Sequence, residues 1–315
     1  MTAPAALITP RLTTRLFQSE EDWWLVRNLI IETHAITGPD FNWELRHWDG
    51  NGFHDAVPGW EQEKFKKFCL WETEEGRLAG LAHNSYTGEL SMEIHPDFRD
   101  RIEEEMIAYG EAHYAEPTED GKHSLMLTVY EYDAPRKRIL IERGYQKRGD
   151  GWVSRYMRIC NRPIPTPQIA EGYTMRATET SWEECQKMAD LLNIAFGRVN
   201  FHQPEDYWSF ITRSPSFRHD LNLVAVAPDG SFAAHVGLTY DEANCFAIFE
   251  PVCTHPDHRR RRLAQTLMFE GLHRVKALGA THITVSTGDD PGANALYESI
   301  GFTEAYKAYH WAKVF

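Results

Sequence analysis

Hydrophobic and polar positions along this chain alternate between strand-like runs and stretches with helical spacing. Short strand-like runs, such as 11–17 and 90–94, are separated by stretches in which apolar residues recur at helical spacing. The run 221–227 turns at a Pro-Asp-Gly sequence into 232–240, which predicts a β-hairpin. The alternation predicts an α/β fold of the mixed α+β kind, with mostly antiparallel twisted sheets flanked by helices.

The order of these elements occurs twice. A strand and an acidic-capped helix open each half, at 11–36 and at 173–195. Later in each half a strand runs into a His-Pro-Asp sequence, at His95 and at His255, and a helix-like stretch follows. The repeat predicts two related domains in tandem.

The boundary between the two domains is predicted from length and proline content. A chain of 315 residues is long for a single core. Residues 161–168 carry three prolines, which favours an extended connector. We therefore expect a first domain at 1–160, a Pro-rich linker at 161–171 and a second domain at 172–315.

Composition and charge exclude several classes of function. The formal net charge of −13 repels nucleic acid and anionic lipid. No apolar run approaches the roughly 18 residues of a membrane span, and residues 1–10 lack the basic start and apolar middle of a secretory leader. The five cysteines are an odd number without a Cys-x-x-Cys pair. These features predict a cytoplasmic protein that binds neither nucleic acid nor membrane, and they leave a homodimer open.

The strongest candidate chemistry lies at 246–279, where a strand, a turn and a helix follow one another. Four consecutive arginines stand at the start of this helix. Free amides and the positive end of the dipole attract phosphate at a helix N-terminus, and the arginines add fixed positive charge. The segment predicts a diphosphate site made by Arg259, Arg260, Arg261, Arg262, Leu263 and Ala264. The alternative is that the arginines form a solvated face.

Two motifs resemble the GNAT superfamily of acyl-CoA N-acyltransferases. The superfamily's cofactor turn, Gln/Arg-x-x-Gly-x-Gly/Ala, matches Arg259 and Ala264, with Arg262 in place of the first glycine. The segment 289–302 resembles its Asn-x-x-Ala-x-x-Leu-Tyr-x-x-x-Gly-Phe sequence in compressed form, with Asn294 and Tyr297 matched. The resemblance covers nearly all of 173–315 and, more loosely, 11–160, and it implies tandem GNAT domains.

The resemblance also implies a reaction and roles for residues. It implies direct transfer of an acetyl group from acetyl-CoA, as co-substrate, to a primary amine of a small molecule or peptide. Tyr297 is then the general acid for the CoA sulfur, Asn294 contacts the pantetheine arm, and Val252 and Cys253 offer backbone groups to the pantetheine and thioester. The alternative for Tyr297 is a half-buried helix aromatic.

The residues themselves supply a candidate base. Deprotonating an ammonium needs a carboxylate or a water held by one, and Glu250 directly precedes the turn. An outward strand carboxylate or a structural partner for an arginine stays open as its other interpretation. His255 and His258 have no third ligand at metal-site spacing, so no metal is expected.

The first half lacks the corresponding residues. Arg99 and Arg101 match arginines of the turn, but Ile102 falls at Arg262 and Glu104 at Ala264, and the acidic residues 103–105 oppose a diphosphate there. Leu140 and Lys137 fall at the tyrosine and asparagine positions. We expect a degenerate GNAT-like domain that helps wall the acceptor cleft. The aromatic-rich segment 41–60 either lines an amine pocket or fastens a loop to its own core.

Two other functions remain open on the sequence. One is a non-catalytic acyl-CoA sensor or scaffold. The other is a transferase of a different acyl group, such as an aminoacyl or succinyl transferase, on the same fold.

Overall fold

The computed structural model describes residues 11–38, 40–288 and 290–315, so residues 1–10 and Asp289 of the C-terminal motif lie outside the described residues. The first half contains, in order, β1 (Leu12–Leu16), α1 (Glu20–His34), α2 (Leu45–Phe53), β2 (Cys69–Thr73), β3 (Leu78–His83), β4 (Ser91–Ile94), α3 (Arg99–His113), β5 (Glu116–Pro117), β6 (His123–Tyr130), α4 (Ala134–Glu142) and β7 (Gln146–Arg158).

The second half repeats much of this order. It contains β8 (Thr174–Ala177), α5 (Trp182–Ala195), α6 (Pro204–Arg213), β9 (Asn222–Val226), β10 (Phe232–Asp241), β11 (Phe246–Thr254), α7 (Leu263–Ala277), β12 (His282–Thr287), α8 (Pro291–Ile300) and β13 (Glu304–Val314). Residues 159–173 between the halves contain neither helix nor strand. Among the described helices, none combines the length and apolar character needed to cross a bilayer.

The described strands form two sheets. One sheet has the order β1-β2-β3-β4, and the other has the order β5-β6-β13-β7-β12-β11-β10-β9-β8. Every pair of neighbouring strands is antiparallel except β11 and β12, which are parallel. The predicted α/β fold with mostly antiparallel sheets and flanking helices is therefore confirmed.

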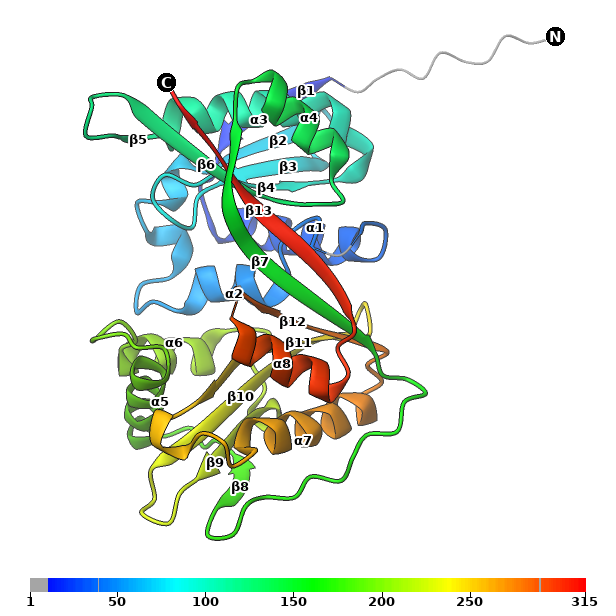
Figure 1. Ribbon diagram of the computed structural model, residues 1–315. Coiled ribbons are helices and arrows are strands. Elements are labelled where there is room, and N and C mark those ends of the chain that lie inside the picture. Colours follow the sequence, from blue (N-terminus) through cyan, green and yellow to red (C-terminus); the bar gives the residue numbers. More distant parts are fainter. Residues whose placement is uncertain (1–10, 39, 289) are drawn as a thin grey trace, which may run out of the picture.

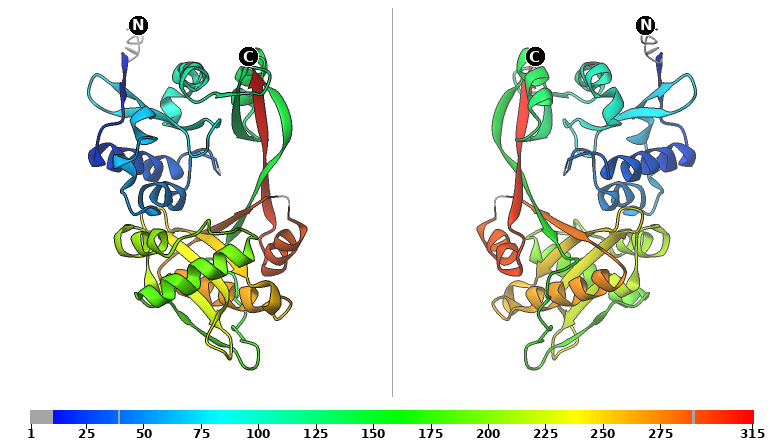
Figure 2. Two further views of the ribbon diagram at one scale, coloured as in Figure 1. Left: turned by 90° about the vertical axis from the view of Figure 1, so that its left-hand side faces the viewer. Right: turned by 90° about the vertical axis from the view of Figure 1, so that its right-hand side faces the viewer.

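The two halves exchange their last strands. β7 of the first half pairs with β12 of the second, and β13 of the second half pairs with β6 of the first. β7 and β13 also pair with each other, and they run side by side from one half to the other (Figures 1 and 2). The predicted repeat gave the order of these strands, whereas their exchange was not foreseen.

The hydrophobic cores follow this exchange. Trp311 of β13 is 9% exposed and packs in the core around α3 and β3 of the first half. Another core joins Trp23 and Trp48 of the first half with Phe210 of α6. Because buried apolar area is the main stabilising contribution to folding, each half depends on the other for part of its stability.

Candidate active site

The central feature of the site is a gap between two parallel strands. β11 and β12 pair from Phe246 to Phe249 and then separate, so β11 has no β12 partner from Glu250 onward. Gly237 of β10 lies against this point, where an added Cβ would approach the Glu250 carbonyl oxygen to 2.7 Å. The predicted pantetheine residues Val252, half-buried, and Cys253, buried, lie in the separated stretch. A chain that enters the gap therefore meets an open strand edge.

The separated stretch of β11 leads into the arginine-rich turn. α7 begins at Leu263, and within the described residues the backbone amides of 260–265 donate no hydrogen bond. All four arginines of the turn are exposed. The guanidinium of Arg259 donates to the carbonyl of Ala195 at 3.3 Å, and that of Arg261 lies 5.9 Å from the ring of Tyr173. Free amides at a helix N-terminus and nearby positive charge are the elements of an anion site.

The departure from the GNAT turn at Arg262 concerns only the side chain. Arg262 adopts φ +59°, the left-handed conformation that glycine adopts at low cost. A side chain in this conformation costs about 1–2 kcal/mol. Arg262 thus keeps the backbone course of a glycine and points a cation toward solvent.

Tyr297 lies on α8 and is 5% exposed. Burial, followed by the charges of Asp290, Glu250 and Cys253, raises the pKa of its phenol above the ordinary value, so the hydroxyl keeps its proton at neutral pH. The ring packs against Phe302 with 6.3 Å between centroids. A protonated phenol within electrostatic reach of Glu250 suits a proton donor.

Asn294 has its amide engaged inside the protein. Its Oδ1 accepts from Arg155 Nε at 2.8 Å, and its Nδ2 donates to the carbonyl of Asp290 at 2.8 Å. Arg155 belongs to β7, the strand contributed by the first half, and also pairs with Glu298 at 2.7 Å. In this structure Asn294 ties α8 to the exchanged strand.

Glu250 has a partner from the first half. Its Oε2 lies 2.8 Å from Nε2 of His47 on α2, and the Glu250 side chain is 34% exposed. Burial alone would raise the pKa of Glu250, but the charge and hydrogen bond of His47, with the charge of Arg46, lower it to about 2. Burial likewise opposes the charge on His47, yet Glu250 raises the pKa of His47 to about 9. The pair is therefore ionised at neutral pH.

Comparisons with known proteins fit this geometry. A model of the acetyltransferase (GNAT) family matches residues 185–302, which include the gap, the turn and α8. No curated protein matches the sequence.

Solved structures extend the likeness of fold to the whole chain. A tandem GNAT protein from the clavulanic acid biosynthesis pathway is 12% identical, with a TM-score of 0.66 over 97% of this chain and 98% of that one. A GCN5-related N-acetyltransferase from Sphaerobacter thermophilus is 20% identical, with a TM-score of 0.64 over 99% and 97%. A GNAT acetyltransferase from Colwellia psychrerythraea is 13% identical, with a TM-score of 0.59 over 96% and 99%.

Among the residues that the structure describes in the first half, none forms an equivalent of the arginine-rich turn. α3 begins at Arg99, four residues after His95, whereas α7 begins at Leu263, eight residues after His255. Glu103 lies in the first turns of α3 and is 1% exposed, and its carboxylate pairs with Arg136 of α4 at 2.8 Å. In the first half a helix with a buried carboxylate thus takes the place of the open loop. The negative charge of that carboxylate opposes binding of a diphosphate there.

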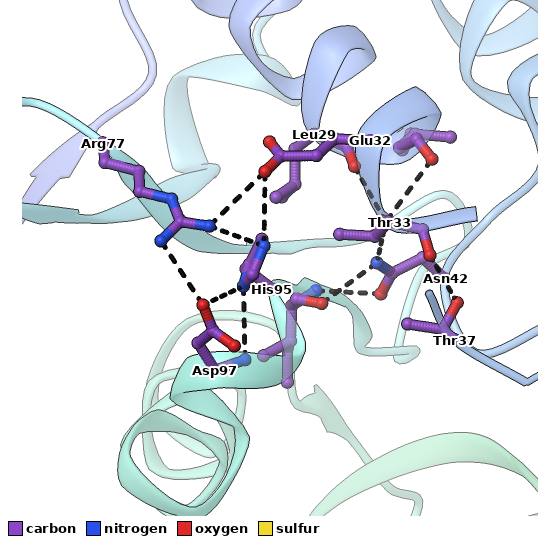
Figure 3. A network of polar contacts seen from close by, with 10 residues as sticks. Leu29, Glu32, Thr33, Thr37, Asn42, Arg77, His95 and Asp97 are labelled. Atoms are coloured by element: carbon purple, nitrogen blue, oxygen red, sulfur yellow. Dashed lines mark hydrogen bonds and ion pairs between the residues drawn. The ribbon is translucent and has the colours of Figure 1, made fainter. Parts of the chain in front are cut away.

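The strand edge in the first half is covered as well. Asn42 accepts from the Ile94 amide at 2.9 Å and donates to the Ile94 carbonyl at 3.0 Å and to Thr33 Oγ1 at 2.8 Å (Figure 3). Ile94 aligns with Thr254, at the end of the separated stretch in the GNAT domain, when the His-Pro-Asp sequences are superposed. A side-chain amide therefore takes up the β4 backbone groups that have an open counterpart in the second half.

Sequence reasoning missed the contribution of α2 to the site. His47 lies in the aromatic-rich segment that was considered for an amine pocket, but nothing in its local sequence indicates Glu250 as its partner. Among the described residues no group of three or more His, Cys, Asp or Glu side chains is arranged to hold a metal ion.

The ion pair predicts a pH dependence of stability. The pKa of His47 is raised in the folded chain, so its contribution to the free energy of unfolding is complete below pH 6.5, the pKa of the unfolded chain. That contribution is lost as pH rises through about 9. The pKa of Glu250 is lowered in the folded chain, so its contribution to the free energy of unfolding is complete above pH 4.5, its ordinary pKa. That contribution is lost as pH falls through about 2. We expect His47→Gln to reduce the free energy of unfolding most between about pH 4.5 and 6.5, and the difference from wild type to vanish above about pH 9.

Urea unfolding as a function of pH measures this difference. His113→Gln, which changes an exposed histidine on α3, is the matched control and should give no such window. A deficit in His47→Gln that stays constant from pH 5 to 9.5 contradicts a charged pair.

Proposed function

We propose that this protein is an N-acetyltransferase that moves an acetyl group from acetyl-CoA directly to a primary amine of a small molecule or peptide. The observation that carries the proposal is the continuity of the open β11 edge with the free amides of 260–265, beside the buried, protonated Tyr297. An elongated ligand with a diphosphate at one end fits a strand edge that leads into an anion site.

The residues have distinct tasks in this proposal. The amides of 260–265 and the four arginines hold the diphosphate, and Val252 and Cys253 offer backbone groups to the pantetheine arm. The co-substrate supplies a thioester, whose C–S bond breaks as the amine nitrogen forms a C–N bond. Tyr297 donates its phenolic proton to the departing sulfur.

Removal of the amine proton falls to the Glu250–His47 pair. A carboxylate whose pKa is about 2 is a poor acceptor of a proton from an ammonium. Glu250 therefore acts through its charge, which orients the amine. His47, 2.8 Å away, is protonated at neutral pH and takes the amine proton only in the neutral form that it gains as pH rises toward about 9. The base is thus shared between the two halves of the chain.

The experiment is a thiol-release assay with purified protein, acetyl-CoA and a panel of primary amines. We expect saturable release of CoA that requires an amine, and acetylated amine detected by mass spectrometry in equal amount. Acetyl-CoA binding without turnover of any amine identifies the sensor or scaffold instead. A preference for succinyl-CoA in direct competition identifies a different acyl donor.

A further inference from the structure

Three buried carboxylate oxygens beside the candidate site lack hydrogen-bond donors. They are Oδ2 of Asp40 and both Oε atoms of Glu44, on the segment between α1 and α2. Glu44 is only 5% exposed. An unsatisfied buried carboxylate is costly and indicates a missing partner.

The segment that carries these carboxylates is held in place. The Trp43 amide donates to Glu93 Oε2 at 2.7 Å, and the side chain of Asn42 bonds both backbone groups of Ile94 (Figure 3). Tyr156 of β7 donates its hydroxyl to Asp40 Oδ1 at 2.9 Å. These contacts hold the backbone of residues 42–43, which lies between half-buried Asp40 and buried Glu44.

Glu44 lies one imidazole ring away from Glu250. Nδ1 of His47 is 3.8 Å from Glu44 Oε2, and Nε2 of the same ring is 2.8 Å from Glu250 Oε2. The carboxylates of Glu250 and Glu44 therefore flank the two nitrogens of one ring, and Glu44 is the carboxylate next to an amine bound at Glu250.

A cavity adjoins Glu44 at the contact between the halves. Its walls include Glu44, His34, Asp241, Phe246 and Ile248. The cavity measures about 10 Å³, close to the size that holds one water molecule, and a terminal ammonium group is of similar size. Acidic groups and an apolar wall together suit an alkylammonium.

The cations around this cavity have other partners. Arg46 also lines it, but its guanidinium contacts His54 Nε2 at 2.9 Å and lies 4.3 Å from the ring centroid of Phe210. Burial lowers the pKa of His34 below its ordinary value, and the charges of Asp241 and Asp40 offset this only in part, so His34 is neutral at pH 7. Neither side chain donates a hydrogen bond to Glu44.

We propose that the acceptor is a diamine, with the amine to be acetylated at Glu250 and a second ammonium held by Glu44 and Asp40. This inference rests on the proposed N-acetyltransferase function and names its substrate class. Burial raises the pKa of Glu44 and of Asp40 because it disfavours their charged forms, and a nearby ammonium stabilises those charged forms. The second charge then selects a diamine over a monoamine.

The test compares α,ω-diaminoalkanes of three to five carbons with aminoalkanols of the same length, in which a hydroxyl replaces the second ammonium. We expect kcat/KM of the wild type to be at least tenfold higher for the diamine. Glu44→Gln, which keeps the shape and removes the charge, should lower kcat/KM for the diamine about tenfold and leave that for the aminoalkanol unchanged. Glu63→Gln, at a side chain that is 86% exposed, is the control and should change neither value.

Calorimetric binding of the diamine in the presence of CoA provides a readout that does not need turnover. Tighter binding of the diamine than of the aminoalkanol, lost in Glu44→Gln, supports the inference. Equal binding of the two, or an equal loss of both in Glu44→Gln, overturns it. Absence of turnover with every amine contradicts the proposed function, and the binding comparison still decides the inference.

Discussion

Replacing Tyr297 by phenylalanine is expected to lower kcat for acetyl transfer about 100- to 1000-fold while the dissociation constant of acetyl-CoA stays within about twofold. Loss of a positioned general acid typically costs factors of this size. Among the described residues the Tyr297 hydroxyl makes no hydrogen bond, and the packing of the ring against Phe302 is kept in phenylalanine. The variant should therefore fold as the wild type does, which thermal unfolding checks.

The control for this experiment is Tyr309→Phe. Tyr309 is half-buried on β13 and contacts Lys147, on the strands that join the two halves. Steady-state kinetics should show wild-type kcat for this variant. Activity of Tyr297→Phe within threefold of the wild type means that another group, or solvent, protonates the sulfur.

A glutamate at Ala264 is expected to weaken acetyl-CoA binding about 100-fold. Ala264 is 8% exposed in the first turn of α7, and the first half has Glu104 at the aligned position. A carboxylate about 6 Å from a phosphate charge, at an effective dielectric constant of about 20, costs about 3 kcal/mol, which corresponds to roughly 100-fold in affinity. Isothermal titration calorimetry measures the change.

Ala264→Gln separates charge from size in this experiment. Glutamine is almost isosteric with glutamate, so we expect it to weaken binding about tenfold or less. Equal losses in the two variants indicate crowding alone. Unchanged affinity in both places the diphosphate away from this turn.

The sequence predicted the local parts of the site well. The helix predicted at the end of 246–279 lies at Leu263–Ala277 in the structure, and the predicted 221–227 and 232–240 hairpin corresponds to β9 and β10. Such features depend on neighbours within one or two turns of chain, which is the range that periodicity and capping report. Repetition of the order of elements likewise indicated the tandem arrangement.

The parts that were missed depend on contacts distant in sequence. Exchange of β7 and β13 between the halves obeys hydrophobic patterns that fit either partner strand, so pattern alone does not choose. His47 meets Glu250 across 203 positions of sequence, and Asn294 meets Arg155 across 139. The left-handed conformation of Arg262 could not be predicted from the sequence, because arginine seldom adopts it.

Both halves contribute to the site in this account, but only one of them offers a place for the diphosphate. The first half supplies His47, Asp40 and Glu44 to the acceptor side, while its own β4 edge is covered by Asn42. In the proposed function, the first half therefore forms a wall on the acceptor side of the site.

A crystal structure of the protein with CoA bound tests the central claim most directly. The account predicts one CoA per chain, with diphosphate oxygens within hydrogen-bond distance of the amides at 260–264 and the sulfur beside the Tyr297 hydroxyl. Diphosphate density next to Glu103 at the start of α3, or a sulfur remote from Tyr297, contradicts it.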